Sequence, residues 1–296
     1  MALEADRVIV TAALTGVLAT REQCPYLPYT PEEIGEEARR AHEAGAAVVH
    51  IHGREPESGG PTWSVDIYRR IRDEVRARSP ILINFSTGGF NMGVEDEAAK
   101  RERLAYVPAT RPELAALNMG SMNYAKYSAG RKAFVFDLVF PNPFGDILLA
   151  AEAMRQGGVK PELECFDLGH VANAEPLVQM GALRRPLQYS FVLGVLGGAP
   201  PAAETLAAMA RAIDFRDTWE VIGIGRAQWK LVGAALALGG NVRVGLEDNF
   251  YLDASGTQMA RGNGPLVEKA VRMARDVGRE PMSPAEARVA LSLPGV

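Results

Sequence analysis

The chain has 296 residues, of which 47% are hydrophobic and 23% charged, a composition typical of a globular, enzyme-sized protein. Its net charge of −4, with no basic cluster, argues against binding to nucleic acid, and Cys24 and Cys165 are too few for a disulfide framework. The N-terminus is unlike a signal peptide and no apolar run approaches the roughly 20 residues of a membrane span, so we expect a cytoplasmic protein.

Eight short apolar runs, each typical of a strand covered on both faces, alternate with amphipathic segments typical of helices. The clearest helical pattern is 30–46, with Thr30 as the expected N-cap and Gly45 as the stop. Segments 64–78 and 227–240 follow the same pattern. The expected strands are 8–13, 47–52, 81–86, 114–118, 162–166, 187–193, 220–224 and 241–245.

This alternation predicts an α/β fold, and eight units in about 250 residues favour a (β/α)₈ TIM barrel, a single domain over 1–296. An open doubly wound sheet is the alternative, although no GxGxxG follows the first strand. Segment 119–160 is longer than an ordinary loop and helix, so we expect an inserted hairpin or irregular loop over one barrel face. The last helix, 283–293, has no partner strand and is expected outside the barrel.

Two of the four histidines lie together in VVHIHGR (48–54), at the end of the second strand. Alternate residues of a strand point the same way, so His50 and His52 share a face. The active site of a barrel forms at the C-terminal strand ends. There, an HxH pair can bind one metal ion, which we favour over a pair of buried, backbone-bonded histidines.

A third ligand is available where the eighth strand enters its loop, in VRVGLEDN (242–249), which contains Arg243, Glu247 and Asp248. In a closed barrel the second and eighth strands both flank the first, and neighbouring strands are about 4.8 Å apart, so these side chains can converge. Exposed acids at a loop start are the alternative. With the two histidines opposite, a His₂Glu site is favoured.

Small polar residues follow two further strands. Segment 86–89, STGG, offers hydroxyl and backbone N–H donors to an anion, although on this motif alone a simple strand-to-helix turn is favoured. Ser121 and Asn123 come after the fourth strand and are able to hydrogen-bond a ligand.

Charged residues follow the fifth and seventh strands. Glu162 and Glu164 are expected to point into the barrel, where a buried carboxylate needs a partner. Asp167 and His170 belong either to the site or to the next helix start. Arg226 follows the seventh strand, a common phosphate site in barrels, although a surface salt bridge fits it equally well.

Six segments together resemble the beta-keto acid cleavage enzymes, a family that includes the 3-keto-5-aminohexanoate cleavage enzyme. The likeness runs from about residue 7 to the final helix, and HxHxRE followed by VRVGxEDN is a specific combination. The segments are TAALTG, PYTPEEIGEEARRAHEAGAAVVHIHGRE, STGG, PELECFDLGH, FVLGV and GGNVRVGLEDN.

The resemblance implies a (β/α)₈ barrel, usually a homotetramer, with a divalent metal that is typically Zn²⁺. The implied reaction converts a β-keto acid and acetyl-CoA into acetoacetate and the CoA thioester of the rest of the substrate. The residues that match the family's site are His50, His52 and Glu247 as metal ligands, Ser86, Thr87, Gly88 and Gly89 for the substrate carboxylate, Ser121 and Asn123 as pocket lining, and Glu164, Arg243 and Asp248 for catalysis.

These residues and the implied chemistry agree, because a Lewis acid beside a carboxylate site can polarise a ketone β to that carboxylate. We hypothesise that Asp248, oriented by Arg243, removes a proton from the acetyl-CoA methyl group. The carbanion adds to the ketone, CoA moves within the adduct, and a retro-Claisen step releases acetoacetate. Glu164 would relay protons or orient Ser86.

The chain departs from the family at Leu18, where the aminohexanoate enzyme has an acid that meets the substrate's amino group. Because a leucine cannot pair with an ammonium group, we predict an uncharged, apolar β-keto acid as substrate.

Two other functions are compatible with a metal-binding barrel. An amidohydrolase-like hydrolase needs histidines on later strands, and His170 alone is available. A barrel that binds a metal and a ligand without catalysis would leave the cluster of Arg243, Glu247 and Asp248 incidental.

Overall fold

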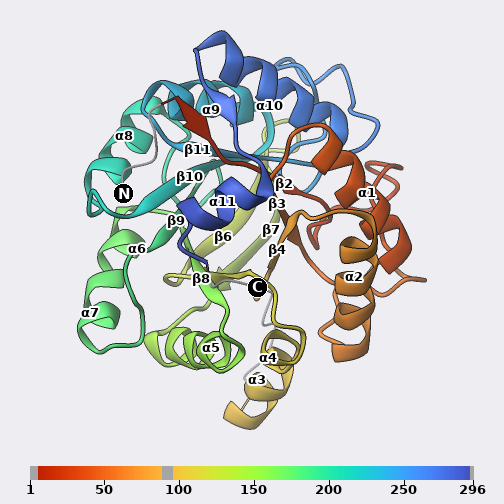
Figure 1. Ribbon diagram of the computed structural model, residues 1–296. Coiled ribbons are helices and arrows are strands. Elements are labelled where there is room, and N and C mark those ends of the chain that lie inside the picture. Colours follow the sequence, from red (N-terminus) through yellow and green to blue (C-terminus); the bar gives the residue numbers. More distant parts are fainter. Residues whose placement is uncertain (1–5, 89–95, 294–296) are drawn as a thin grey trace.

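A closed barrel of eight parallel strands forms the centre of the computed structural model, which describes residues 6–88 and 96–293 (Figure 1). Its order, β10-β11-β2-β3-β4-β5-β8-β9, confirms the predicted TIM barrel and excludes the open sheet. All eight predicted strands are present, within a few residues of the expected ends. The barrel strands are β2 Val10–Ala13, β3 Val48–Ile51, β4 Leu82–Phe85, β5 Leu114–Asn118, β8 Lys160–Cys165, β9 Gln188–Leu193, β10 Thr218–Gly223 and β11 Asn241–Val244.

Helices surround the barrel (Figure 1). The three helices predicted from their end signals are present as α1, α2 and α9, and α1 begins with a capping box between Thr30 and Glu33. In the described part of the chain, no helix is long and apolar enough to cross a membrane. These outer helices are α1 Pro31–Glu43, α2 Val65–Arg78, α3 Glu97–Leu104, α4 Tyr106–Thr110, α5 Phe144–Gly157, α6 Leu168–Ala172, α7 Ala174–Gln179, α8 Ala203–Arg211, α9 Gln228–Ala237 and α10 Gly264–Asp276, with a 3₁₀ turn at Gly225–Ala227.

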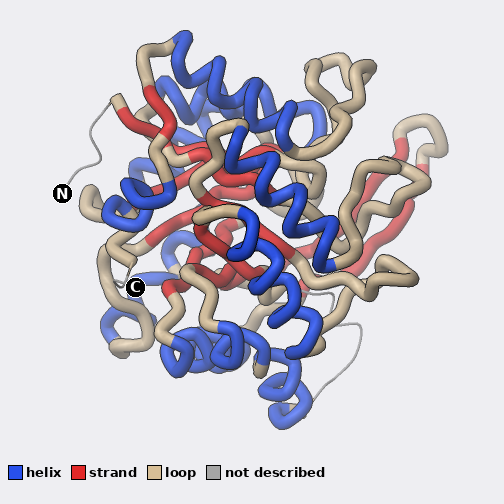
Figure 2. Tube along the Cα trace, turned by 45° about the vertical axis from the view of Figure 1, so that its right-hand side comes forward, coloured by secondary structure: helices blue, strands red, loops and turns tan. Residues whose placement is uncertain are grey.

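The predicted insertion is an antiparallel hairpin, formed by β6 Met122–Ser128 and β7 Ala133–Phe140. Figure 2 shows the hairpin projecting from the barrel at the right of the view. Its base is part of a small apolar cluster at the barrel end: Met122, Phe140, Phe166, Val192 and Ile222.

The last helix, α11 Pro284–Ala290, lies outside the barrel as predicted, and it covers the N-terminal end (Figure 1). Ala287, Leu291 and Leu293 share an apolar cluster with residues that begin the barrel strands, among them Ile9 and Leu82. A short parallel pair, β1 Arg7–Val8 with β12 Glu280–Pro281, precedes this helix. Because this end is covered, a ligand has to enter from the opposite, C-terminal end.

The barrel interior is polar in the layer below that end. Glu162 and Glu220 are buried there, and Ser190 Oγ lies 2.8 Å from an oxygen of the first and 3.1 Å from an oxygen of the second. Thr11 donates to Glu220 and Asn84 donates to Glu162. One serine hydroxyl has a single proton to donate, so one of the two carboxyl groups must be protonated to make the second bond. Burial accordingly raises the pKa of both carboxyl groups.

Candidate active site

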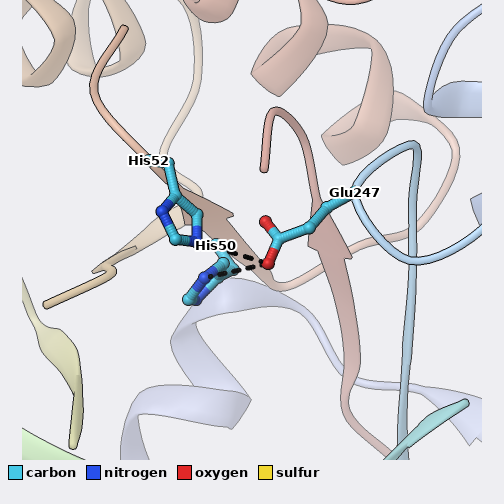
Figure 3. Close-up of side chains that lie close together, drawn as sticks. All are labelled: His50, His52 and Glu247. Carbon is cyan, nitrogen blue, oxygen red and sulfur yellow. Dashed lines mark ion pairs between the residues drawn. The ribbon is translucent and has the colours of Figure 1, made fainter. Parts of the chain in front are cut away.

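His50, His52 and Glu247 meet at the C-terminal end of the barrel. Glu247 Oε1 lies 3.6 Å from His50 Nε2 and 3.3 Å from His52 Nε2, and Figure 3 shows the carboxylate pointing toward both rings. One ligand atom from each residue lies within 4.8 Å of the others. The three meet because β3, which carries His50 and leads to His52, and β11, which leads to Glu247, both pair with β2.

The donor set fits a divalent metal ion. Both ring nitrogens of His50 are buried and have no hydrogen-bond partner among the described residues, which is costly unless something binds them. Burial holds the pKa of His50 well below its usual value, so the ring is neutral, as a metal ligand must be. Although burial opposes it, Arg243 and the histidines hold the pKa of Glu247 well below its ordinary range. Two neutral imidazoles and a carboxylate are ligands that zinc accepts.

Arg243 connects the ligand Glu247 to two further carboxylates. It donates two bonds of 3.0 Å to Asp248, one of 2.7 Å to Glu247 and one of 3.3 Å to Glu164. All three carboxylates surround one buried guanidinium. They pair with its positive charge, which would be costly to bury in the barrel without a partner. Burial raises the pKa of Asp248 to about 6, against the lowering effect of Arg243, and burial also raises the pKa of Glu164.

The backbone of the GLEDN segment places these acids. Gly245 has φ +150°, and a Cβ there would lie 2.1 Å from the carbonyl oxygen of Ala13, so glycine is required. The next residues turn back, and the Glu247 amide donates to the Ala13 carbonyl oxygen at 3.2 Å. Gly16 contacts the same carboxylate, because its amide donates to Glu247 Oε2 at 3.1 Å.

The acids and the metal-ligand cluster open into a cavity of about 870 Å³. Its floor is polar and its upper wall is largely apolar, with side chains from the hairpin and from the loop after β9. The predicted site residues that line this cavity are Leu18, His52, Ser86, Gly88, Glu164, Arg243, Glu247 and Asp248.

Other predicted site residues lie elsewhere. Ser121 and Asn123 are exposed and do not line the cavity, and the Ser121 hydroxyl accepts a bond from the Asn142 amide. Thr87 donates its hydroxyl to the Ala116 carbonyl, and it also lies outside the cavity lining. Gly89 falls outside the described residues.

Arg226 is exposed and lies outside the cavity lining, although the preceding Gly225 belongs to it. Asp167 caps α6 by accepting from the His170 amide, and His170 Nδ1 accepts from the Phe166 amide. Asp167 and His170 therefore belong to the start of α6, and neither lines the cavity.

Two residues of the site have no predicted role. Asn118 lines the cavity as the last residue of β5, and its Oδ1 has no partner among the described residues. The sequence did contain a signal for Asn118, because this polar residue ends the apolar run of the predicted strand 114–118, at the catalytic end of the barrel. Arg54 is 1% exposed and donates to the carbonyl oxygens of Gly16, Thr15, Ala19 and Gly59. It holds the segment that carries Leu18 and that donates to Glu247.

Comparison with known proteins gives one consistent result. A family model described as beta-keto acid cleavage enzyme matches residues 7–293. The 3-keto-5-aminohexanoate cleavage enzyme of Fusobacterium nucleatum subsp. nucleatum is 39% identical over 289 residues, which cover 97% of this chain and 98% of the relative. The 3,5-dioxohexanoate:acetyl-CoA acetone transferase of Paraburkholderia graminis is 35% identical over 306 residues, which cover 98% of this chain and 96% of the relative.

Among solved structures, the binary complex of ObcA with oxaloacetate superposes with a TM-score of 0.71 at 24% identity. The match covers 92% of this chain and 68% of that chain. At this identity the likeness shows the barrel fold and nothing about the reaction.

Proposed function

The chain belongs to the beta-keto acid cleavage enzyme family, and from this premise we propose that it converts an uncharged, apolar β-keto acid and acetyl-CoA into acetoacetate and the acyl-CoA of the rest of the substrate. The observation that supports this most directly is the set of hydrogen bonds made by Arg243. Its guanidinium bonds Asp248, Glu164 and Glu247 beside two histidines, at the floor of a cavity with an apolar upper wall.

His50, His52 and Glu247 would hold a divalent cation, which we propose is Zn²⁺. Bound there, the cation would supply Lewis-acid polarisation of the substrate ketone. The buried and unpartnered Nε2 of His50, which faces Glu247, supports this assignment.

The remaining chemistry is assigned to the protein's own side chains. Asp248, held on both oxygens by Arg243, takes a proton from the acetyl-CoA methyl group, and the carbanion attacks the ketone carbon of the keto acid. CoA then transfers within the adduct, and the carbon–carbon bond breaks to release acetoacetate. Glu164, bonded to the other end of Arg243, relays protons or orients Ser86.

Segment 86–89 is proposed to bind the substrate carboxylate. Ser86 and Gly88 line the cavity, and the Gly88 amide donates to the Ser86 hydroxyl oxygen at 3.2 Å, which leaves the hydroxyl proton for the substrate. Since the Thr87 hydroxyl is engaged by Ala116, a contribution from Thr87 would come from its backbone.

The choice of an apolar substrate is based on the cavity wall. Relatives of similar identity have names that differ in the substrate, a cationic amino acid in one and a dioxo acid in the other, so overall identity does not select one. Here Leu18, Phe140 and Val192 line the cavity. A buried ammonium group beside such side chains would lose its hydration without a partner, whereas a 3-oxo fatty acid of short to medium length would not.

The test is a screen of β-keto acids with acetyl-CoA that measures acetoacetate release. We expect turnover with β-ketohexanoate to exceed turnover with 3-keto-5-aminohexanoate, and a preference for the cationic substrate would contradict the substrate assignment. Metal analysis together with this acetyl-CoA-dependent assay separates the alternatives: the hydrolase would turn over its substrate without CoA, and a non-catalytic barrel would show no turnover.

We also propose that the single barrel domain assembles as a homotetramer, as the family resemblance implies, and that it is cytoplasmic, as its cysteine content and N-terminus suggest. Arg226, at the loop after β10, is retained as a candidate phosphate contact outside the cavity lining. Sedimentation measurements would test the assembly.

A further inference from the structure

We propose that Lys126, with Arg131 and Lys132 beyond it on the same hairpin, binds the phosphate groups of acetyl-CoA. This inference rests on the proposed function, because acetyl-CoA must be a substrate for the site to matter. It assigns a binding site on β6 and on the turn that follows it, an element that the reaction scheme does not use.

The charges around the cavity support this assignment. The floor carries Glu164, Glu247 and Asp248, which Arg243 and the proposed cation neutralise, so the floor has no surplus positive charge to offer the phosphates of CoA. Among the described residues that line the cavity, Arg243 and Lys126 are the lysine or arginine side chains. Arg243 is committed to three carboxylates, whereas Lys126 is exposed and makes no ion pair with a described residue.

Lys126 also lies in the right direction from the acids. Alternate residues of β6 share a face, so Met122, Tyr124 and Lys126 run from the barrel end outward. Met122 packs in the apolar cluster at the hairpin base, and Tyr124 stacks on Phe136 with ring centroids 5.7 Å apart. Each two-residue step adds about 7 Å, which carries the lysine away from the floor.

Burial and the nearby acids Glu247, Glu164 and Asp248 raise the pKa of Tyr124 to about 12. The Tyr124 phenol therefore interacts electrostatically with the acids of the cavity floor. Tyr124 precedes Lys126 by two residues on the same face of β6. The strand leads from the reacting end of the cavity to its opening, the path that a thioester with its phosphates outside would follow.

The hairpin is fixed against the rest of the cavity wall. The Ala125 amide donates to the Leu196 carbonyl at 3.2 Å, which joins β6 to the loop after β9. Gly197 allows the approach, since a Cβ there would lie 1.8 Å from the Asn123 carbonyl oxygen. Apolar side chains of both segments, including Val195 and Phe140, line the cavity on the floor side of Lys126, since Phe140 pairs with Met122 at the hairpin base. An uncharged pantetheine arm suits that space.

Arg131 and Lys132 continue the positive charge past Lys126. Both are exposed in the turn between β6 and β7, and neither forms an ion pair with a described residue. Against these three cations the hairpin has one acid, Asp137. The chain as a whole has a net charge of −4, but the hairpin is positively charged. A positive element of this kind suits a polyphosphate ligand.

The test compares acetyl-CoA with acetyl-pantetheine, which lacks the phosphates. For Lys126→Ala we expect the KM for acetyl-CoA to rise about fivefold, and for the triple alanine variant of Lys126, Arg131 and Lys132 about fiftyfold. The kcat and the KM for the β-keto acid should hardly change. With acetyl-pantetheine the variants and the wild type should agree. Lys230→Ala, an exposed lysine on α9, is the matched control and should behave as wild type.

An unchanged KM for acetyl-CoA in the triple variant would overturn the inference, as would an equal loss with acetyl-pantetheine. A rise confined to Arg226→Ala would also overturn it and place the phosphates at the loop after β10. Calorimetric titration with CoA separates this inference from the proposed function. If the wild type binds CoA and the triple variant binds it weakly, the site stands even when the keto acid is wrong. If the wild type does not bind CoA, both fail.

Discussion

Asp248 differs from the other acids of the site because Arg243 bonds both of its oxygens. The two bonds of 3.0 Å fix the carboxylate, and it lines the cavity. Asp248→Asn keeps the shape but removes the proton acceptor, so we expect kcat to fall by roughly 10²–10⁴ in saturating metal. Asp66→Asn, at the exposed first turn of α2, is the control. Turnover that survives the Asp248 change would end the role of Asp248 as base.

Leu18 is the residue through which we expect the substrate to be selected. It is 50% exposed, lines the cavity and lies on the segment held by Arg54. Leu18→Glu would supply a partner for an ammonium group, so the ratio of kcat/KM for the amino substrate over β-ketohexanoate should rise by roughly tenfold. Leu18→Gln, of the same size as Glu without the charge, should leave the ratio near that of wild type. An equal rise in both variants would assign the effect to polarity rather than charge.

The sequence predicted the site residues whose geometry follows from strand periodicity. His50 and His52 share a face because they are two positions apart on a strand, and Glu247 follows from strand adjacency in a closed barrel. Ser121 and Asn123 lie outside the cavity lining because Ser121 precedes β6 and Asn123 alternates on β6 with Met122 and Tyr124, and the sequence did not reveal where this strand begins. The role of Arg54 depends on carbonyl groups from separate segments, and no sequence pattern encodes those.

Among the elements, α11 was expected from its capping signal, but the cap does not say where the helix packs. The structure places Leu291, at its C-terminal end, in the cluster under the barrel at 2% exposure. Leu291→Ala should reduce the free energy of unfolding by about 2–4 kcal/mol, measured by urea denaturation. Val289→Ala, at 68% exposure on the same helix, should change it by less than about 0.5 kcal/mol. Equal effects would mean that α11 does not seal the barrel.

The hairpin is a second element whose presence could be predicted from the sequence but whose position could not. The length of segment 119–160 predicted an insertion, and β6 and β7 are found within it. Its position over the cavity depends on the bond between Ala125 and Leu196, residues distant in sequence, so local patterns could not give it. Long-range contacts of this kind turn an insertion into part of the site.

At the scale of the whole molecule, the polar layer inside the barrel should make stability depend on pH. Glu220 accepts from Thr11 and faces Glu162 through Ser190, while Arg243 lowers its pKa and Asp248 raises it. Burial is the largest influence and raises the pKa of Glu220 above its ordinary value of 4.5.

The folded state therefore holds this proton more tightly than the unfolded state. Above about pH 4.5 the unfolded chain gives up the proton first, so this group lowers stability as pH rises toward its folded pKa. Glu220→Gln removes that ionisation, and its amide can donate to Ser190. We expect the loss of unfolding free energy between about pH 5 and pH 8 to be smaller in the variant, although Glu162 keeps part of it. An unchanged loss in urea titrations would show that Glu220 ionises freely in the folded protein.

The proposed metal site joins segments far apart in the chain, so metal removal should lower the stability of the whole fold. With Glu164, Glu247 and Asp248 ionised, the cluster around Arg243 carries a net charge of −2, which one divalent ion neutralises. Binding to the folded state alone adds about 2.7 kcal/mol at a hundredfold excess over Kd, which raises Tm by several degrees.

Zinc added to chelator-treated protein should therefore raise Tm in calorimetry. Glu247→Gln should lose most of the increment, because an amide is a weaker zinc ligand than a carboxylate. Glu204→Gln, exposed on α8, should keep it. An equal increment in the Glu247 variant would place the stabilising ion elsewhere. This measurement needs no substrate, so it tests the metal site even if the keto acid is misassigned.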